Sequence, residues 1–184
     1  MRPFKFCRLE ADTELKSFKS IDDDLNDFLL NDAKNYAEEL LAVTYLMIDA
    51  ETDDIIAYYS LLNDQIRFTE DDKSVRNRIN RSIPFSKQRT HYPAVKIGRL
   101  AVAEAYAHQG IGQAILESIK YKFTHGNRTG CRFITLDAYA HAVGFYEKCG
   151  FHNHPVPRPQ PSRTPSSSSP PTSTCYAAPS APSS

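Results

Sequence analysis

The fold of this chain is decided by the stretch Arg99-Leu100-Ala101-Val102 and, after five intervening residues, His108-Gln109-Gly110-Ile111-Gly112-Gln113-Ala114. It has the pattern of an apolar strand, a tight glycine turn and the first residues of a helix. Glycine lets the backbone approach a ligand closely, and the free N–H groups at a helix start attract anions together with the positive end of the helix dipole. The stretch therefore predicts an anion site of the kind that typically holds a pyrophosphate.

A second segment supports this interpretation, Ala142-Val143-Gly144-Phe145-Tyr146-Glu147-Lys148-Cys149-Gly150-Phe151. Together the two segments resemble the GNAT family of N-acetyltransferases, over roughly residues 4 to 151. The family motif Gln/Arg-x-x-Gly-x-Gly/Ala is matched by Gly110 and Gly112, while Ala107 replaces its first residue. The later motif, Ala-x-x-Phe-Tyr-x-x-x-Gly-Phe, is matched at every fixed position and is the stronger signal.

The resemblance implies an α+β fold of three layers, in which helices flank a central, mostly antiparallel mixed sheet. The helical spacing of Leu25, Phe28, Leu29, Ala33, Tyr36 and Leu40 predicts one buried helix face. Residues 42–48 and 55–62 read as an antiparallel hairpin, and residues 63–93 as an irregular basic insertion with one helix near 73–81. We further expect strands at 95–102 and 133–137, a helix from the glycine turn that Gly126 and Gly130 close, and a short helix over 142–149.

The composition changes completely after Phe151. Residues 152–184 contain nine Pro and nine Ser, and they predict a disordered tail in place of the two strands that normally complete this fold. We therefore expect a GNAT domain at 1–151 followed by a Pro/Ser-rich tail at 152–184. A natural tail and a frameshifted gene product both explain it, and we favour the frameshift. Either leaves a sheet edge exposed, which predicts reduced stability or a homodimer.

Charge and cysteine content narrow the class of protein. The chain is 41% hydrophobic with a net charge of zero, but residues 73–99 carry eight Lys or Arg and no acidic residue. Such a block attracts phosphates of CoA or of a nucleic acid, although a solvated loop and helix face explains it equally well. Cys7, Cys131, Cys149 and Cys175 have no metal-binding spacing and read as reduced thiols. Without a signal peptide or a long apolar run, we expect a cytoplasmic protein and no membrane contact.

The resemblance also implies the chemistry, which is direct attack of a primary amine on the thioester of the co-substrate acetyl-CoA. Leu100, Ala101 and Val102 would bind the pantetheine arm, with the Val102 N–H as donor to the thioester oxygen. Tyr146 matches the general acid of many members, since a phenol with a pKa of about 10 can protonate a thiolate near 8.5. Packing between helix and sheet is the alternative role for Tyr146. The residues expected to hold the cofactor are Leu100, Ala101, Val102, His108, Gln109, Gly110, Ile111, Gly112, Gln113 and Phe145.

Two features of this chemistry stay open. Phe145 would form a wall against the adenine or pantetheine, and a core position suits it nearly as well. The general base is Glu104, Asp137, His91, His108 or an ordered water, and each side chain also has an ordinary structural explanation.

Three functions are compatible with the sequence. The first is transfer of acetyl to a small-molecule or peptide amine. The second rests on Leu25-Asn26-Asp27-Phe28-Leu29, Thr44-Tyr45-Leu46 and Gly98-Arg99-Leu100-Ala101-Val102, which look like the branch of bacterial toxins that acetylate aminoacyl-tRNA and pair with a ribbon-helix-helix antitoxin. The third is a non-catalytic protein that binds acyl-CoA, which Ala107 and the missing strands favour. Gly110, Gly112 and Tyr146 oppose it.

Overall fold

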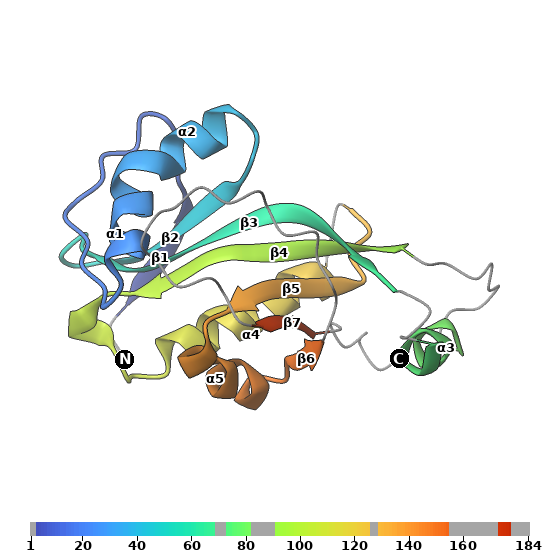
Figure 1. The fold of residues 1–184 in the computed structure, drawn as a ribbon. Helices are drawn as coiled ribbons and strands as arrows, with labels where there is room; N and C mark the ends of the chain where they lie inside the picture. The colour runs from blue at the N-terminus through green and yellow to red at the C-terminus, as the bar shows by residue number, and fades with distance from the viewer. Residues whose placement is uncertain (1–2, 69–72, 82–90, 126–128, 155–172, 178–184) are drawn as a thin grey trace. The chain divides into compact units, whose positions relative to one another are not determined.

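The computed structural model describes residues 3–68, 73–81, 91–125, 129–154 and 173–177. The strands are β1 (Phe4–Arg8), β2 (Val43–Asp49), β3 (Ile55–Arg67), β4 (His91–Val102), β5 (Phe133–Ala138), β6 (His152–His154) and β7 (Ser173–Ala177). The helices are α1 (Asp23–Asp27), α2 (Ala33–Glu38), α3 (Lys73–Arg81), α4 (Ile111–Thr124) and α5 (Val143–Lys148). The hydrogen-bonded strand order is β1-β2-β3-β4-β5-β7-β6 (Figure 1).

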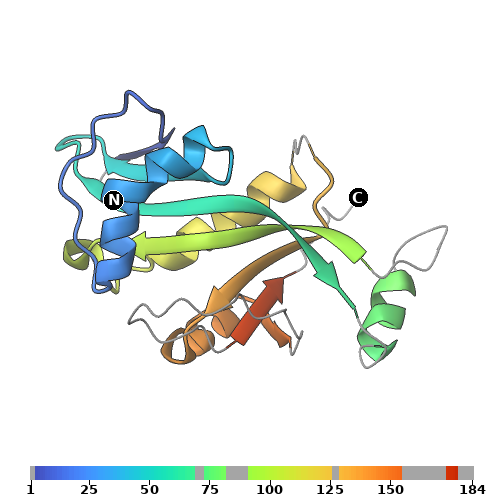
Figure 2. The same ribbon diagram turned by 45° about the horizontal axis from the view of Figure 1, so that its top comes forward.

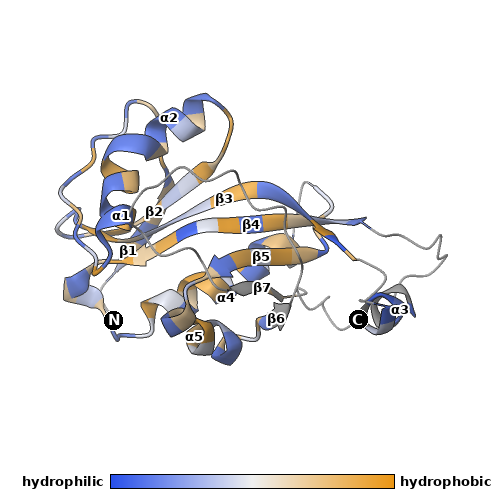
Figure 3. Cartoon of the chain, in the orientation of Figure 1, coloured by the Kyte–Doolittle hydropathy of each residue, from blue (hydrophilic) through white to orange (hydrophobic). Residues whose placement is uncertain are grey.

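The chain divides into two compact units. Unit 1 comprises residues 1–62 and 96–122, and unit 2 comprises residues 63–95 and 123–184, so that β3 and β4 run through both. Hydrophobic residues gather along β3, β4 and β5 in Figure 3, as expected for strands whose side chains are buried. The α+β fold expected from the sequence is confirmed.

Unit 1 is built on the predicted hairpin of β2 and β3, which pair antiparallel, with β1 antiparallel to β2. Neighbouring tyrosines on β3 point to opposite faces, as strand geometry requires. The Tyr58 hydroxyl donates to the Leu25 carbonyl oxygen of α1 at 2.6 Å, whereas the Tyr59 hydroxyl accepts from Lys122 of α4 at 2.8 Å. The helices α1 and α2 therefore cover one face of these strands and α4 the other (Figures 1 and 2).

The first helical segment is interrupted by a π-helical turn, Phe28–Asp32, between α1 and α2. Phe28, Leu29 and Ala33 are buried as predicted, but Tyr36 and Leu40 are 40% and 89% exposed, and the prediction of their burial is wrong. The π turn inserts an extra residue and rotates α2 relative to α1, and the helix ends at Glu38. Leu40 then adopts the left-handed conformation with φ of 57°.

Unit 2 has its own apolar cluster in the segment expected to be irregular. β3 continues to Arg67 and β4 begins at His91, so the strands extend into the predicted insertion at both ends. The rings of Phe68, Tyr92 and Phe133 pack edge to face, with centroids 5.7 to 6.3 Å apart. These aromatic contacts bury apolar surface in a segment whose sequence shows no regular hydrophobic spacing. The predicted helix is present as α3, whereas residues 82–90 lie outside the described part of the chain.

The later motif of the sequence forms α5 and its C-terminal cap. The Phe151 N–H donates to the Tyr146 carbonyl oxygen at 3.0 Å and the Gly150 N–H to that of Glu147 at 2.9 Å, the two bonds of a Schellman cap. Gly150 has a φ of 79°, which only glycine adopts easily. The rings of Tyr146 and Phe151 also touch, with centroids 5.9 Å apart. Part of the Phe-Tyr-x-x-x-Gly-Phe motif is therefore the ending of a helix.

The prediction that no strand follows Phe151 is wrong at two places. β7 pairs antiparallel with both β5 and β6, and Cys175 and Ala177 are fully buried. The segment Ser173-Thr174-Cys175-Tyr176-Ala177 is free of proline, so its backbone N–H groups can join the ladder, a property that the average composition of the tail concealed. Residues 155–172 and 178–184 lie outside the described residues, and the domain boundary at Phe151 stays a prediction.

Candidate active site

The glycine turn in unit 1 has the geometry that a bound anion needs. His108 and Gly110 take positive φ angles of 61° and 78°, which turn the chain sharply from the end of β4 into α4. The first bond of the helix runs from Ala114 N–H to the Gly110 carbonyl oxygen at 3.0 Å. The N–H groups of Ile111, Gly112 and Gln113 therefore have no partner within the helix. A Cβ placed on Gly110 would meet no atom within 4 Å, so the space above the turn is open, and these residues fit a pyrophosphate.

The residues expected to bind the pantetheine arm lie in the last part of β4. Ala101 is buried, whereas Leu100 and Val102 are half-buried. The Ala103 N–H donates to the Ile56 carbonyl oxygen of β3 at 2.8 Å. Since successive amides of a strand point to opposite sides, the Val102 N–H points away from β3, as a donor to a ligand must.

The departure from the family motif at Ala107 leaves the turn intact. Ala107 has an extended backbone after the short 3-10 turn Glu104–Tyr106, and its N–H donates to Glu104. The Gln109 side chain donates to the Ala105 carbonyl oxygen at 3.3 Å, which ties the turn to the preceding segment. His108, Gln109 and Gly110 are exposed, so a ligand can reach their backbone.

Tyr146 lies in unit 2, on α5, where it is half-buried against aromatic rings. The centroids of Phe145 and Phe151 lie 5.1 and 5.9 Å from it. Burial, followed by the nearby thiols of Cys175 and Cys149, raises the pKa of Tyr146 to about 12. The phenol thus stays protonated at neutral pH and keeps its donor. Phe145 is 38% exposed, which does not fit a purely core role.

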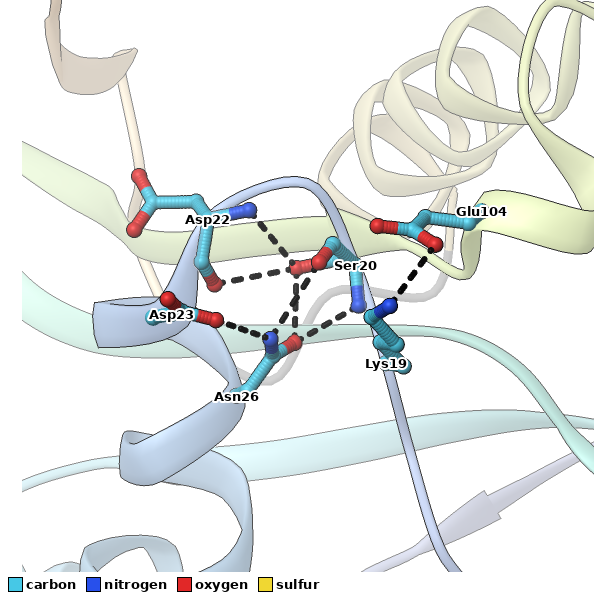
Figure 4. A network of polar contacts seen from close by, with 6 residues as sticks. All are labelled: Lys19, Ser20, Asp22, Asp23, Asn26 and Glu104. Atoms are coloured by element: carbon cyan, nitrogen blue, oxygen red, sulfur yellow. Dashed lines mark hydrogen bonds and ion pairs between the residues drawn. The ribbon is translucent and has the colours of Figure 1, made fainter.

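The candidates for the general base lie in both units, Glu104 and His108 in unit 1 and His91 and Asp137 in unit 2. Glu104 is held by the chain before α1, with a 3.5 Å ion pair to Lys19 and a backbone bond from its own N–H to the Lys19 carbonyl oxygen at 2.9 Å (Figure 4). This anchoring favours its structural explanation. His108 is exposed in the turn, His91 begins β4 and Asp137 lies on β5, and their roles stay predictions.

One group of residues in unit 1 was not predicted from the sequence. The Arg99 guanidinium carbon lies 5.0 Å from the centre of the Phe28 ring, and Arg99 Nε lies 4.0 Å from a carboxylate oxygen of Asp24. Arg99 and Phe28 each occur in segments that carried the resemblance to the toxin branch. Their contact could not be foreseen, because β4 and α1 are far apart in the sequence and only the tertiary fold joins them.

Comparison with known proteins identifies the family to which this chain belongs. The sequence model of the acetyltransferase (GNAT) domain matches residues 50–153, more than half of the chain. The chain therefore belongs to the GNAT family. No curated protein sequence gives a significant match.

Solved structures with a similar fold include bacterial toxins. One described as a bacterial toxin has a TM-score of 0.69 at 17% identity, covering 97% of this chain and 92% of that chain. AtaT complexed with acetyl-methionyl-tRNAfMet has a TM-score of 0.64 at 20% identity, covering 82% and 87%. The KacTA–DNA complex has a TM-score of 0.65 at 16% identity, covering 96% and 93%. At these identities the likeness shows a shared fold.

Membership in this family defines the reaction class. The chain is an acetyl-CoA-dependent acyltransferase, and acetyl-CoA is its co-substrate. Among the helices of the described residues, none is both long and apolar enough to cross a membrane.

Proposed function

We propose that this GNAT protein is a toxin-type enzyme that transfers acetyl from acetyl-CoA to the α-amino group of an aminoacyl-tRNA. The observation that carries the proposal is the fold shared with AtaT, which was solved with acetyl-methionyl-tRNAfMet, over 82% of this chain. Segments in α1, β2 and β4 resemble the toxin branch in sequence, which supports the same proposal. Acetyl transfer itself follows from the family.

The charge distribution between the two units supports an RNA acceptor. Unit 2 contains 12 basic and 6 acidic residues, a net charge of +6, whereas unit 1 contains 10 basic and 16 acidic residues, a net charge of −6. Contacts to phosphates dominate the affinity of proteins for nucleic acids. Unit 2 is thus the part of the chain that we expect to bind the tRNA, with exposed Lys73 and Arg81 on α3 among the contributors.

The step itself needs few protein groups. The unprotonated amine attacks the thioester carbon, its N–C bond forms, and the Val102 N–H stabilises the negative charge on the thioester oxygen. The C–S bond then breaks, the Tyr146 hydroxyl donates its proton to the leaving sulfur, the proton of the amine passes to solvent, and solvent returns a proton to the Tyr146 phenolate. Because the pKa of Tyr146 is raised to about 12, above that of an ordinary thiol, the hydroxyl acts first as a hydrogen-bond donor and gives up its proton late.

Acetylation of a small-molecule or peptide amine is the second candidate. It is favoured by the acidic unit 1, whose net charge of −6 would attract cationic amines. The two candidates differ in their dependence on salt. Binding of tRNA by unit 2 should weaken steeply as salt is raised, whereas a single cationic amine should respond weakly.

The experiment uses the full chain with radiolabelled acetyl-CoA and three acceptors: aminoacyl-tRNA, uncharged tRNA and free amines. The proposal predicts label on the amino acid of the aminoacyl-tRNA and none on uncharged tRNA. Charge reversal of Arg81 to Glu should raise the KM for tRNA severalfold, while Arg8→Glu on β1 serves as the control in unit 1. Labelling of free amines alone would contradict the proposal.

The partners follow from the same proposal. The AtaT toxin was solved bound to the C-terminus of its antitoxin AtaR. By analogy, we expect an antitoxin of the ribbon-helix-helix type that blocks this enzyme. A homodimer stays an expectation from the sequence, and the sheet edge from which it was argued is covered, since β7 and β6 follow β5 in the sheet. Equilibrium sedimentation of the purified chain would test the dimer, and a monomer at working concentration would contradict it.

A further inference from the structure

Arg99 of β4 occupies an unusual position in unit 1. Its guanidinium stacks over Phe28 at 5.0 Å, and its Nη1 donates to the Gly98 carbonyl oxygen at 3.0 Å. The buried Nε atom has no hydrogen-bond partner in the part of the chain that the structure describes. A buried donor of a charged group without a partner is costly, and it often indicates a group that is bound in the working protein. The Arg99 side chain as a whole remains 39% exposed, so a ligand can reach it.

Asp24 of α1 faces this arginine without closing on it. Its carboxylate oxygen lies 4.0 Å from Arg99 Nε, which is too long for a hydrogen bond, and the Asp24 side chain is 52% exposed. The two groups therefore present a cationic donor and an anionic acceptor side by side. Half-buried Leu25 precedes the buried ring of Phe28 on the same helical segment, which gives this part of the surface an apolar component.

The helix that carries Asp24 is held firmly in place. Asn26 Oδ1 accepts from the Ser20 N–H at 2.7 Å and from the Ser20 hydroxyl at 2.8 Å, and the Asp22 side chain caps the helix (Figure 4). The Tyr58 hydroxyl of β3 also donates to the Leu25 carbonyl oxygen at 2.6 Å. Asp24 takes part in the hydrogen bonds of this helix through its backbone N–H and its carbonyl oxygen, so its carboxylate is left for a ligand on a preorganised frame.

We propose that Arg99 and Asp24 form the acceptor subsite, and that they recognise the α-aminoacyl group. An α-aminoacyl group has an ammonium and a carbonyl oxygen about 3 Å apart on neighbouring carbon atoms. Asp24 accepts hydrogen bonds from the ammonium before it loses its proton, and the Arg99 guanidinium donates to the carbonyl oxygen. Arg99 immediately precedes Leu100, so this subsite and the pantetheine segment lie on the same strand, β4. This inference rests on the proposed function and names the part of the acceptor that the protein recognises.

The experiment compares amides of leucine, methionine and glycine with the matching amines that have the same side chain and no carboxamide. Binding to the full chain is followed by NMR through the Arg99 Nε–H signal, assigned with Arg99→Lys. The inference predicts that the amides shift this signal and that the amines do not. Equal shifts, or none, would overturn it. The NMR signal does not depend on turnover, so it tests the subsite even if no acceptor is acetylated. A lack of acetylation would contradict the proposed function and not the subsite.

Turnover gives a second test, with rates compared at equal concentrations of unprotonated amine. In Arg99→Gln the preference for amide over amine should fall roughly 10- to 100-fold, the value of a hydrogen bond from a charged group. Asp24→Asn, on an exposed site that tolerates the change, should raise the KM for the amide and leave the KM for acetyl-CoA unchanged. Arg8→Gln on β1 and Asp32→Asn after the π turn are the matched controls. An unchanged preference in a folded Arg99→Gln protein would overturn the inference.

Discussion

Unit 1 and unit 2 differ in charge and in the kind of group that each contributes. Unit 1, with a net charge of −6, offers backbone N–H groups at an open glycine turn, and unit 2, with a net charge of +6, offers the side chain of Tyr146 on a capped helix. Backbone donors survive most side-chain substitutions, which explains why Ala107 in the motif leaves the turn intact. The contribution of a single side-chain hydroxyl, in contrast, is lost with one substitution. Binding of the co-substrate and turnover should therefore fail through different mutations.

The largest effect is expected in unit 2. Tyr146→Phe should lower kcat by about 100- to 10,000-fold, the contribution of a positioned general acid, because it removes the hydroxyl and keeps the ring. Acetyl-CoA affinity should stay within a factor of two or so. Steady-state kinetics with an aminoacyl acceptor, beside calorimetry, measures both. A folded Tyr146→Phe protein with normal kcat would leave only the packing role against Phe151.

The next effect belongs to unit 1. Gly112→Trp places a large side chain at the start of α4, where the free N–H groups should meet a pyrophosphate, and should weaken acetyl-CoA binding by roughly 100-fold or more. Tryptophan is tolerated in helices, so the fold should persist. Gly130→Trp is the control, since a Cβ at Gly130 meets nothing within 4 Å. Equal affinity in Gly112→Trp and wild type would place the cofactor elsewhere.

The ends of two helices provide a finer comparison between the units. In α2 the Leu41 N–H donates to the Tyr36 carbonyl oxygen at 2.8 Å, the same cap as in α5, but Leu40 stands where α5 has Gly150. Gly150→Ala should destabilise by about 1–2 kcal/mol, because the left-handed conformation penalises a Cβ. Leu40→Gly should stabilise by up to about 1 kcal/mol, since the exposed leucine loses little packing. Urea unfolding of both variants measures the sign of each change in the free energy of unfolding. A loss of stability in Leu40→Gly would contradict this account of the cap.

Alkaline pH should weaken both units. Burial raises the pKa of Tyr58, Tyr59 and Tyr146 above the usual value of 10.0. Above pH 10 the unfolded tyrosines lose protons that the folded ones retain, so the free energy of unfolding should fall as the pH rises beyond 10. The lowered pKa of Lys122 acts in the opposite direction, but it is one group against three tyrosines and against three thiols, Cys7, Cys131 and Cys175, whose pKa values burial also raises. Urea midpoints from pH 8 to 11 measure the trend, and Tyr146→Phe should reduce its slope. A midpoint that stays constant would contradict the burial of these hydroxyls.

Local patterns in the sequence predicted the elements whose signals are themselves local. The β2–β3 hairpin follows from a polar turn between two apolar runs, and α4 from the glycine turn with isoleucines at helical spacing. The π turn at Phe28–Asp32 could not be predicted, since it arises from packing rather than from a residue type. β7 was missed because a mean composition over 33 residues hides a proline-free run of seven that contains this strand of five. The pair Arg99 and Asp24 was missed for a third reason, which is that tertiary contact alone joins them.

Calorimetric titration of acetyl-CoA into the full chain and into Tyr146→Phe tests the central claim most directly, because it separates the binding turn of unit 1 from the tyrosine of unit 2. The account predicts one site with the same affinity in both proteins, and loss of turnover only in the variant. Absence of binding by the folded wild-type chain would contradict it, and would leave a GNAT fold that does not take up its co-substrate.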